Sequence, residues 1–550
     1  MLDSSVAVAQ HANRLLEAVE LRGLEGALRD VVMGSFNLAV IDLARGEVMI
    51  ANDRMGSIPL HYAEVPGGVI VTSVPALLGL GRLVPREIDW TACAEILYLG
   101  HTLGERSVVA HASRLRPAAM LRWSARSGSL ETVPTKLAPT GLEPDPGPAD
   151  VDGIGDRIEE ACRRHARLGG HSALFLSGGM DSRLLLAAWP RDETLPCYSY
   201  GPADYVDVVV ARIVAAHRGA PHTHVPLPGD AVAAGFPEMA RFAGVPVFPN
   251  RYVAAQRVRD DGFHNVVDGY MGDAVLGGGY YKFQRYLSRT AGYLQRGDVF
   301  VDWPVARVGL DAITNAVLVE MIDPDAGGWA ARFLHPDIAA RLAVEGENVR
   351  QELWREVRLH ASAHESAALV LRDLRLNNRN HHGITLQGAN SSRFARVYYP
   401  FVCDVPLLEA LFRVRPRDAA FRRLQLRLFR RRYPSYAALP FAASRLPLRR
   451  SSRFHRWAPL LRGFGLSVGT ASPELAGARG VYDEWDEWLR ESAALRALAV
   501  DLLVKLGFAE PAQIRARMSE IASGRARGAG ELLHLAGLAH LLDAPTGPRR

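Results

Sequence analysis

At residues 177–183 the chain reads Ser177-Gly178-Gly179-Met180-Asp181-Ser182-Arg183. An apolar run, Ala173–Leu176, comes before this turn, and the apolar residues Leu184–Ala188 follow it. This order predicts a buried strand that leads into a glycine turn and then opens a helix. Two adjacent glycines let the backbone approach phosphate oxygens closely, and the amides at a helix N-terminus carry a positive partial charge. The stretch therefore predicts a pyrophosphate cradle.

Side chains of the same turn suit a phosphate and its metal ion. The hydroxyls of Ser177 and Ser182 add donors, and Asp181 supplies a hard oxygen ligand for Mg²⁺. The turn lacks the Lys of a Walker loop, so a different phosphate chemistry is implied. It resembles the PP-loop ATP pyrophosphatases, which cleave ATP to AMP and pyrophosphate while they activate a carbonyl. The alternative is a strand-to-helix turn whose glycines serve packing only.

Length and composition indicate a globular protein with several compact parts. The 550 residues are 48% hydrophobic and 23% charged, and no apolar run reaches the roughly 20 residues that a membrane span needs. We see no signal peptide at the N-terminus. The four cysteines are scattered without a Cys-x-x-Cys pair, which favours neither disulfides nor a zinc site and fits a reducing cytoplasm.

The chain is basic, with a formal net charge of +6 and many more arginines than lysines. Arginines gather at residues 413–432 and 445–453. A solvated helical face explains such clusters, and an anionic substrate or a phosphate-bearing partner is the alternative.

The order of patterns predicts three regions. Residues 1–140 hold one helical pattern, Ala12–Leu28, and then short alternating strands typical of β-hairpins. After a proline-rich linker, residues 151–450 begin with strands alternating with helices, which predicts an α/β fold: a parallel sheet with helices on both faces and a ligand site at the carboxyl ends of its strands. Residues 451–550 are helical, with patterns at Glu484–Leu506 and Ala529–Leu542.

A second glycine-rich segment follows another apolar run, at residues 265–279. It contains Asp268, Gly269, Tyr270 and Asp273. If its strand lies beside the one before Ser177, the carboxylates of Asp181 and Asp273 face one another and share Mg²⁺ on a triphosphate. Without a metal ion the two carboxylates repel each other.

At this point the chain resembles the asparagine synthetase family, from about Gly34 to Leu446. Besides the two glycine-rich segments, residues 51–62 resemble a segment of the family's glutaminase domain, and residues 396–404 resemble its Arg-x-Pro-Phe-x-Asp stretch. The resemblance implies a PP-loop domain, similar to the adenine nucleotide alpha hydrolases, preceded by a truncated β-rich Ntn-amidotransferase-like domain and followed by helices.

The resemblance also implies roles for individual residues. Leu176 and Tyr200 frame the adenosine, and Asp268 and Gly269 contact the nucleotide. The loop of Ser177, Gly178, Gly179, Asp181 and Ser182 holds pyrophosphate, while Asp181 and Asp273 hold Mg²⁺. The family adenylates a carboxylate and lets an amine displace AMP, a step that depends on charge neutralisation and positioning.

Departures from the family pattern bear on the source of the amine. Members that hydrolyse glutamine carry a nucleophilic cysteine directly after the initiator Met. Here Leu2 follows Met1, the first cysteine is Cys93, and the chain begins at what looks like the middle of the amidotransferase domain. We therefore expect no glutaminase activity from this chain.

The residues expected near the amine substrate also depart from the family pattern. Tyr270 stands where asparagine-forming members have Glu, and a Tyr there is similar to that of β-lactam synthetase, where a Tyr-Glu dyad deprotonates an amine. Tyr270 is thus a candidate base, with Glu320 as a candidate partner, and simple aromatic packing beside the nucleotide is the alternative. The family also uses a Lys to neutralise charge, and no Lys lies between Lys282 and Lys505, so we assign that role to Arg445. We interpret His381–His382 as a polar turn without a metal.

These features together predict an ATP- and Mg²⁺-dependent ligase that forms amide bonds through an acyl-adenylate and releases AMP and pyrophosphate. A β-lactam synthetase-like or macrolactam-forming cyclase is the alternative within this class, and a PP-loop RNA-modifying enzyme or a non-catalytic nucleotide-binding protein is the alternative outside it. The expected partners are small-molecule or peptide carboxylates and amines. We expect no membrane and no nucleic acid, and a homodimer is left open.

Overall fold

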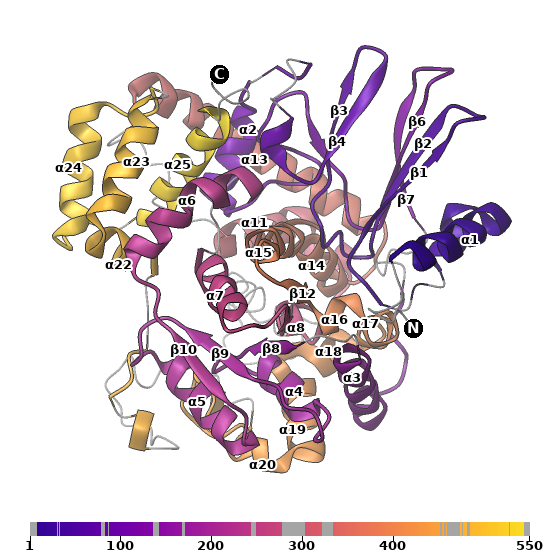
Figure 1. Ribbon diagram of the computed structural model, residues 1–550, viewed down its shortest axis with the longest axis vertical. Coiled ribbons are helices and arrows are strands. Elements are labelled where there is room, and N and C mark those ends of the chain that lie inside the picture. The colour runs from indigo at the N-terminus through magenta and orange to yellow at the C-terminus, as the bar shows by residue number, and fades with distance from the viewer. Residues whose placement is uncertain are drawn as a thin grey trace.

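The computed structural model describes residues 8–29, 31, 33–78, 83–85, 87–135, 142–167, 171–243, 249–277, 303–321, 334–451, 454–455, 458, 473–475, 477–480, 484–505, 507–526 and 528–543. A β-rich N-terminal part, a central α/β part and a C-terminal group of helices lie around one another in Figure 1. Within the described residues, no helix is long and apolar enough to cross a membrane.

The N-terminal part is the predicted arrangement of β-hairpins. One antiparallel sheet has the order β1-β2-β6-β7, and a second has the order β4-β3-β5. The strands and flanking helices are α1 (Val8–Leu28), β1 (Asn37–Asp42), β2 (Glu47–Asn52), β3 (His61–Val65), β4 (Gly68–Thr72), α2 (Trp90–Leu99), β5 (Ser113–Arg114), β6 (Ala119–Ser124) and β7 (Leu130–Pro134). Because Ile50 and Leu121 of one sheet share a core with Tyr62 of the other, the two sheets pack face to face.

The central part contains the predicted parallel sheet, with five strands in the order β10-β9-β8-β11-β12. Its elements are α3 (Val151–Ala166), β8 (Ser172–Phe175), α4 (Asp181–Ala188), β9 (Cys197–Tyr200), α5 (Val206–Arg218), β10 (His222–Val225), α6 (Gly229–Ala243), α7 (Pro249–Asp260), β11 (Asn265–Asp268), α8 (Gly272–Val275) and β12 (Arg396–Tyr398).

Successive side chains of β8 point to opposite faces of the sheet, and both faces are covered. Leu174 belongs to a large core that also contains residues of α3, α4 and α5, whereas Ala173 and Phe175 belong to a core that includes residues of α7. A strand buried on both faces reads as a continuous apolar run, as β8 does. Helices on both faces of the parallel sheet are thus confirmed.

The chain order gives this sheet a switch point. From β8 the chain continues outward to β9 and β10, and it then returns to place β11 on the opposite side of β8. In open α/β sheets, ligands bind outside the carboxyl ends of the strands at the place where the strand order reverses. The loops after β8 and β11 lie at that place.

The remaining residues are mostly helical, as predicted. The helices are α10 (Val305–Val308), α11 (Leu310–Met321), α13 (Pro336–Ala361), α14 (Ala367–Arg375), α15 (His381–Ser392), α16 (Pro400–Cys403), α17 (Val405–Phe412), α18 (Pro416–Ala419), α19 (Arg423–Arg432), α20 (Pro434–Ala437), α22 (Glu484–Glu491), α23 (Ala493–Lys505), α24 (Pro511–Ala522) and α25 (Ala529–Asp543), with a π-helical turn at Leu376–Asn380. Short 3-10 turns occur at Pro75–Leu77, Ala420–Arg422 and Pro473–Leu475.

The helical pattern predicted at 484–506 is interrupted in the structure. It forms two helices, α22 and α23, that meet at Ser492. The Ser492 hydroxyl donates to Asp230 (2.5 Å) and accepts a hydrogen bond from the Leu495 backbone N–H (3.0 Å). A side-chain cap of this kind begins a new helix, which explains the break.

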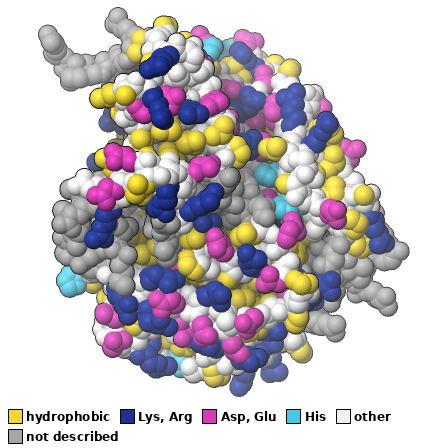
Figure 2. Space-filling view, turned by 90° about the vertical axis from the view of Figure 1, so that its right-hand side faces the viewer, with side chains coloured by type: hydrophobic (Ala, Val, Ile, Leu, Met, Phe, Trp, Pro, Cys, Tyr) yellow, Lys and Arg dark blue, Asp and Glu magenta, His cyan; other side chains and the backbone are white. Residues whose placement is uncertain are grey.

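Many arginines of residues 413–432 pair with acidic side chains. Arg432 contacts Asp156 (2.7 Å) and Glu159 (3.0 Å) of α3, and Arg415 contacts Asp418 (2.7 Å). Basic and acidic side chains are interspersed on the face of the molecule that Figure 2 displays. Pairing with acidic side chains accounts for Arg415 and Arg432.

Candidate active site

The turn after β8 is held by its own hydroxyl groups. The Ser177 backbone N–H donates to Ser182 Oγ (3.1 Å), the two serine hydroxyls lie 3.2 Å apart, and the Gly179 N–H donates to Ser177 Oγ (3.2 Å). A Cβ atom at Gly178 would lie 2.6 Å from the Ala442 side chain and 2.8 Å from the Asp207 carboxylate. Only glycine fits there, because the turn is closely packed against these two residues.

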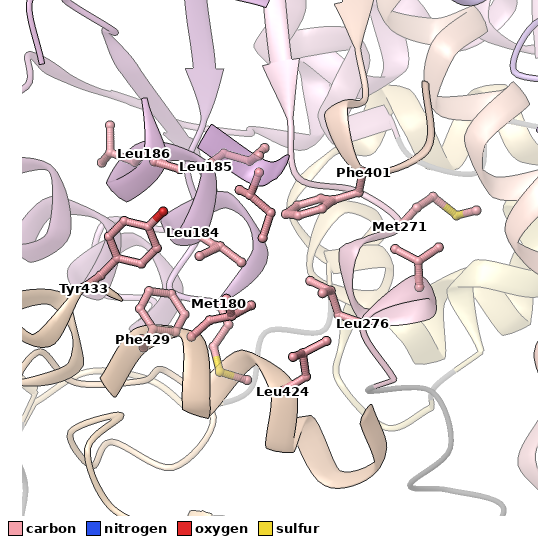
Figure 3. Packing of buried hydrophobic residues seen from close by; sticks show 14 of the residues in the cluster. Met180, Leu184, Leu185, Leu186, Met271, Leu276, Phe401, Leu424, Phe429 and Tyr433 are labelled. Carbon is pink, nitrogen blue, oxygen red and sulfur yellow. The ribbon is translucent and has the colours of Figure 1, made fainter. Parts of the chain in front are cut away.

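Helix α4 starts from this turn and is anchored by an apolar core. Figure 3 shows its leucines, Leu184 to Leu186, packed near Phe429 and Tyr433, which come from α19 and the residue after it. Because these leucines are fully buried, the N-terminus of α4 is fixed relative to the sheet.

The turn after β11 lies against the turn after β8. Strands β8 and β11 pair in parallel, with Asp268 opposite Phe175, so the predicted neighbouring strands are confirmed. A Cβ atom at Gly269 would lie 2.5 Å from the Ser182 backbone nitrogen, and one at Gly272 would lie 2.6 Å from the Asp181 carboxylate carbon. These glycines allow the two turns to touch.

Asp181 lies close to Asp273 in this arrangement. Burial and the Asp273 carboxylate raise the pKa of Asp181 to about 7, while the Arg422 charge and hydrogen bonds from Gln425 and the Asp273 backbone N–H oppose that rise. Among the described residues, no third His, Cys, Asp or Glu completes a metal-binding group with them. Mg²⁺ is commonly bound by one or two carboxylates together with substrate phosphates, so the pair fits that ion, which would relieve the repulsion between the two carboxylates.

A cavity of about 320 Å³ opens beside the two turns. It is lined by Phe175, Leu176, Ser177, Gly179, Asp181, Ser182, Ser199, Tyr200, Tyr205, Asp207, Val208, Asn250, Arg251, Asp268, Gly269 and Tyr270. The structure thus gathers most of the predicted site residues around one hollow, with Gly178 in the same turn. Asp273 and Arg445 do not line this cavity.

Arg251 on α7 is a residue of this cavity that the sequence did not point to. Its guanidinium contacts the Asp268 carboxylate (2.6 Å) and lies 5.0 Å from the Phe175 ring centroid and 5.3 Å from that of Tyr200. Burial raises the pKa of Asp268, and the Arg251 charge opposes that shift. Asp268 also accepts a hydrogen bond from the Tyr270 backbone N–H (2.9 Å). The carboxylate predicted to contact the nucleotide is therefore already engaged within the protein.

Tyr270 forms one wall of the cavity and points toward α15. A Cβ atom at Gly383 would lie 2.1 Å from the Tyr270 hydroxyl oxygen, so the hydroxyl rests against the helix backbone. Burial, together with the Asp273 charge, raises the pKa of Tyr270 well above its usual value. The side chain of Glu320, its predicted partner, lies outside the described residues.

Arg445 is held away from the cavity. It has a positive φ of 55°, and its guanidinium donates to the carbonyls of Leu475 (2.8 Å) and Ala478 (2.6 Å). By contrast, Arg422 and Gln425 act on Asp181 directly, and Gln425 Nε2 donates to its carboxylate. These two residues lie in the arginine-rich stretch at 413–432, where the sequence showed a charge cluster but not which side chain faces inward.

The interpretation of His381–His382 as a polar turn is wrong. Both residues are buried at the start of α15, against the N-terminal part of the chain. His381 Nε2 donates to the Gly56 carbonyl (3.1 Å), and Arg114 donates to His382 Nδ1 (3.0 Å). The partners of both histidines lie far away in the sequence, which is why a local pattern did not reveal their burial.

Comparisons with known proteins identify the family of the chain. Residues 153–436 match the asparagine synthase family, and residues 8–132 match a glutamine amidotransferase domain. Proteins of Mycobacterium tuberculosis and Mycobacterium bovis, provisionally named asparagine synthetase (glutamine-hydrolysing), are 28% identical over 225 residues. These residues make up 39% of this chain and only 34% of each relative. Since the first match covers more than half of the sequence, the chain belongs to the asparagine synthase family.

Proposed function

We propose that the protein is a ligase that uses ATP and Mg²⁺ to join a carboxylate to an amine, with release of AMP and pyrophosphate. The observation that carries the proposal is the contact between the turns after β8 and β11, which brings Asp181 to Asp273 beside the cavity. A phosphate cradle, a pair of acids and a hollow at a switch point of the sheet together suit a magnesium-bound nucleoside triphosphate.

The residues would divide the work as follows. Leu176 and Tyr200 would frame the adenosine, and the backbone N–H groups of residues 177–182 would hold the phosphates. Asp181 and Asp273 would hold Mg²⁺, which neutralises charge on the phosphates when it is bound. Arg422, whose charge already acts on Asp181, takes the neutralising role first assigned to Arg445.

The reaction would proceed in two displacements. A substrate carboxylate oxygen attacks the α-phosphorus of ATP, the bond to the bridging oxygen breaks, and pyrophosphate leaves from the cradle. The amine nitrogen then attacks the acyl carbon, loses a proton, and expels AMP. Donors fixed around the leaving pyrophosphate and close placement of the reactants supply most of the acceleration in such a mechanism. Tyr270, on the cavity wall, would help to place the amine; because burial raises the pKa of its hydroxyl, the amine proton would leave with the AMP phosphate.

We further propose that the amine does not come from glutamine hydrolysis by this chain. All four cysteines are buried, and burial raises the pKa of each thiol, so none of them favours the reactive thiolate. The amine would come from a second substrate or from the carboxylate molecule itself, as in a macrolactam-forming cyclase. Release of glutamate from glutamine, in the presence of ATP, would contradict this part of the proposal.

Trapping the activated carboxylate tests the ligase activity. The protein is incubated with ATP, Mg²⁺, pools of candidate carboxylates and hydroxylamine, and the nucleotide products and hydroxamates are identified by mass spectrometry. We expect AMP, pyrophosphate and a hydroxamate from one pool, and none of them from Asp181→Asn. ADP in place of AMP, or turnover only with added tRNA, would contradict the proposal.

A further inference from the structure

The N-terminal part of the chain packs against the candidate active site through a shared hydrophobic core and through polar contacts. Met55, from the N-terminal part, lies in the same hydrophobic core as Leu184 of α4. Arg54 also contacts Glu409 of α17 (2.9 Å), and the Gly34 N–H donates to the Cys403 carbonyl (3.1 Å). The N-terminal part therefore shares a hydrophobic core with the central part. Such an interface fixes the positions of residues in the central part.

We propose that the N-terminal part sets the position of Tyr270 by clamping the π-helical turn Leu376–Asn380 and the start of α15, with Asn378 as the positioning residue. The proposal rests on the proposed function in one respect, because it assumes that the cavity beside Tyr270 binds ATP.

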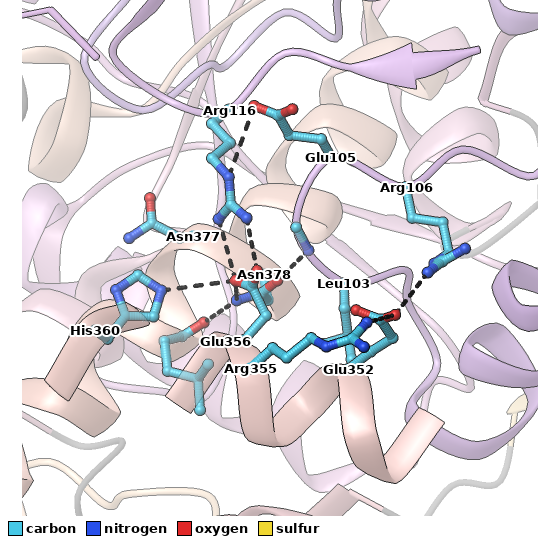
Figure 4. A network of polar contacts seen from close by, with 12 residues as sticks. Leu103, Glu105, Arg106, Arg116, Glu352, Arg355, Glu356, His360, Asn377 and Asn378 are labelled. Carbon is cyan, nitrogen blue, oxygen red and sulfur yellow. Dashed lines mark hydrogen bonds and ion pairs between the residues drawn. The ribbon is translucent and has the colours of Figure 1, made fainter. Parts of the chain in front are cut away.

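Asn378 is the centre of the clamp, as Figure 4 shows. It is 1% exposed, and its Oδ1 accepts a hydrogen bond from the Gly104 backbone N–H (2.7 Å). Its Nδ2 donates to Glu356 Oε2 (3.3 Å) and to the Leu374 carbonyl (2.9 Å). The amide thus joins a loop of the N-terminal part to helices α13 and α14, and its hydrogen-bonding groups are satisfied.

Arg116 fixes the other side of the clamp. Its guanidinium contacts Glu356 through two nitrogens, at 2.6 Å and 3.1 Å. Gly104 has a positive φ of 55°, and a Cβ atom there would lie 2.7 Å from Arg116 and 2.8 Å from Glu356. The planar, two-point contact and the glycine that makes room for it leave little freedom for the helix that carries Glu356.

The clamped turn leads directly into the wall of the cavity. π-Helical turns often occur at functional sites. Here one is followed by His381, which is held by the Gly56 carbonyl, and two residues later by Gly383, on which the Tyr270 hydroxyl rests. Gly383 has no side chain that could move aside, so the Tyr270 hydroxyl lies directly against the backbone of α15. A shift or a rotation of α15 would therefore move Tyr270.

A double-mutant cycle between Asn378 and Tyr270 tests the proposal on the full chain. The affinity for α,β-methylene-ATP with Mg²⁺ is measured by calorimetry for wild type, Asn378→Ala, Tyr270→Phe and the double variant. We expect Asn378→Ala and Tyr270→Phe each to weaken binding about tenfold, because the first leaves the groups that hold the turn before α15 unpaired and the second removes the hydroxyl that rests on α15. The double variant should bind within about twofold of the weaker single variant, because both changes act on one wall.

The chain offers a matched control one residue away. Asn377 lies in the same turn, but its amide donates to the Asp373 carbonyl of the adjoining helix (2.8 Å). Asn377→Ala should change the affinity by less than about twofold and should combine additively with Tyr270→Phe. If Asn378→Ala does not fold, Asn378→Asp with Glu356→Gln is used instead. This exchange keeps one amide and one carboxylate and should bind more tightly than Asn378→Asp alone.

The outcomes separate the two proposals. Losses that multiply for Asn378→Ala and Tyr270→Phe, or an Asn378→Ala variant that binds like wild type, overturn the positioning role while the ligase proposal stands. A folded wild-type chain that fails to bind the nucleotide overturns both.

Discussion

The backbone N–H of Asp273 faces the Asp181 carboxylate, although the two residues follow different strands of the sheet. This contact joins the turns after β8 and β11. It leaves one carboxylate partly neutralised by backbone and the other exposed beside it. Such a pair is poorly stable without a cation and well suited to one.

Removing either acid should strongly weaken magnesium-dependent nucleotide binding. We expect Asp181→Asn and Asp273→Asn each to weaken the affinity for magnesium α,β-methylene-ATP by at least about 100-fold, since each removes a metal ligand. Asp192→Asn, at an exposed carboxylate on the turn after α4, is the control and should bind normally. Equal affinity of Asp181→Asn and wild type in calorimetry would contradict the assignment.

The affinity for Mg²⁺ should depend on pH. Because the pKa of Asp181 is raised to about 7, its carboxyl group is protonated below that pH, and the ion must displace the proton. We expect the magnesium affinity to fall about tenfold from pH 8 to pH 6 and to level off above pH 8.

The same shift has the opposite effect on the metal-free fold. A raised carboxyl pKa gives stability that is present at low pH and is lost as the pH rises through 7. Without Mg²⁺, Asp181→Asn should therefore be more stable than wild type at pH 8, by about 1–3 kcal/mol. Thermal unfolding measured at pH 5 and pH 8 checks this sign, and a variant less stable than wild type at pH 8 would oppose it.

Arg251 and Asp268 should behave as a buried ion pair. Their side chains are 12% and 5% exposed. Arg251→Met leaves the Asp268 carboxylate buried without its cation and should cost about 3–5 kcal/mol of unfolding free energy. Arg251→Met with Asp268→Asn removes both charges and should recover much of that loss. Chemical denaturation of the four chains measures the coupling, and simple additivity would argue against the pair.

Arg422 and Arg445 should differ in their effect on the site. Arg422→Met removes the charge that acts on Asp181, so it should weaken magnesium-nucleotide binding about tenfold. Arg445→Met removes hydrogen bonds to two carbonyls outside the cavity and should leave the affinity within about twofold of wild type. The reverse ranking in the binding assay would restore Arg445 as the neutralising residue.

Patterns of adjacent residues predicted the strands and turns of the site. The apolar run before Ser177 and the one before Gly269 each gave a strand, and the glycines after them gave the turns. Their pairing followed because carboxyl ends of parallel strands meet at one edge of a sheet. Strand β12 has three residues, too few for a periodic pattern to show against the surrounding helices.

The residues that the sequence did not reveal depend on contacts between distant segments. Gln425 and Asp181 are 244 positions apart, and nothing near Gln425 distinguishes it from its arginine-rich neighbours. Arg251 reaches the cavity only because α7 packs against β8 and β9 in the folded chain. Likewise, Asn378 has no motif around it and gains its role from Gly104, 274 positions away.

Structure determination with bound ligand tests the central claim most directly. Crystals grown with α,β-methylene-ATP and Mn²⁺, a substitute for Mg²⁺ with measurable anomalous scattering, locate both the ion and the phosphates. We predict an anomalous peak about 2.2 Å from a carboxylate oxygen of Asp181 and of Asp273, with the triphosphate along residues 177–182. A nucleotide bound elsewhere, or an ion that touches neither carboxylate, would contradict the account.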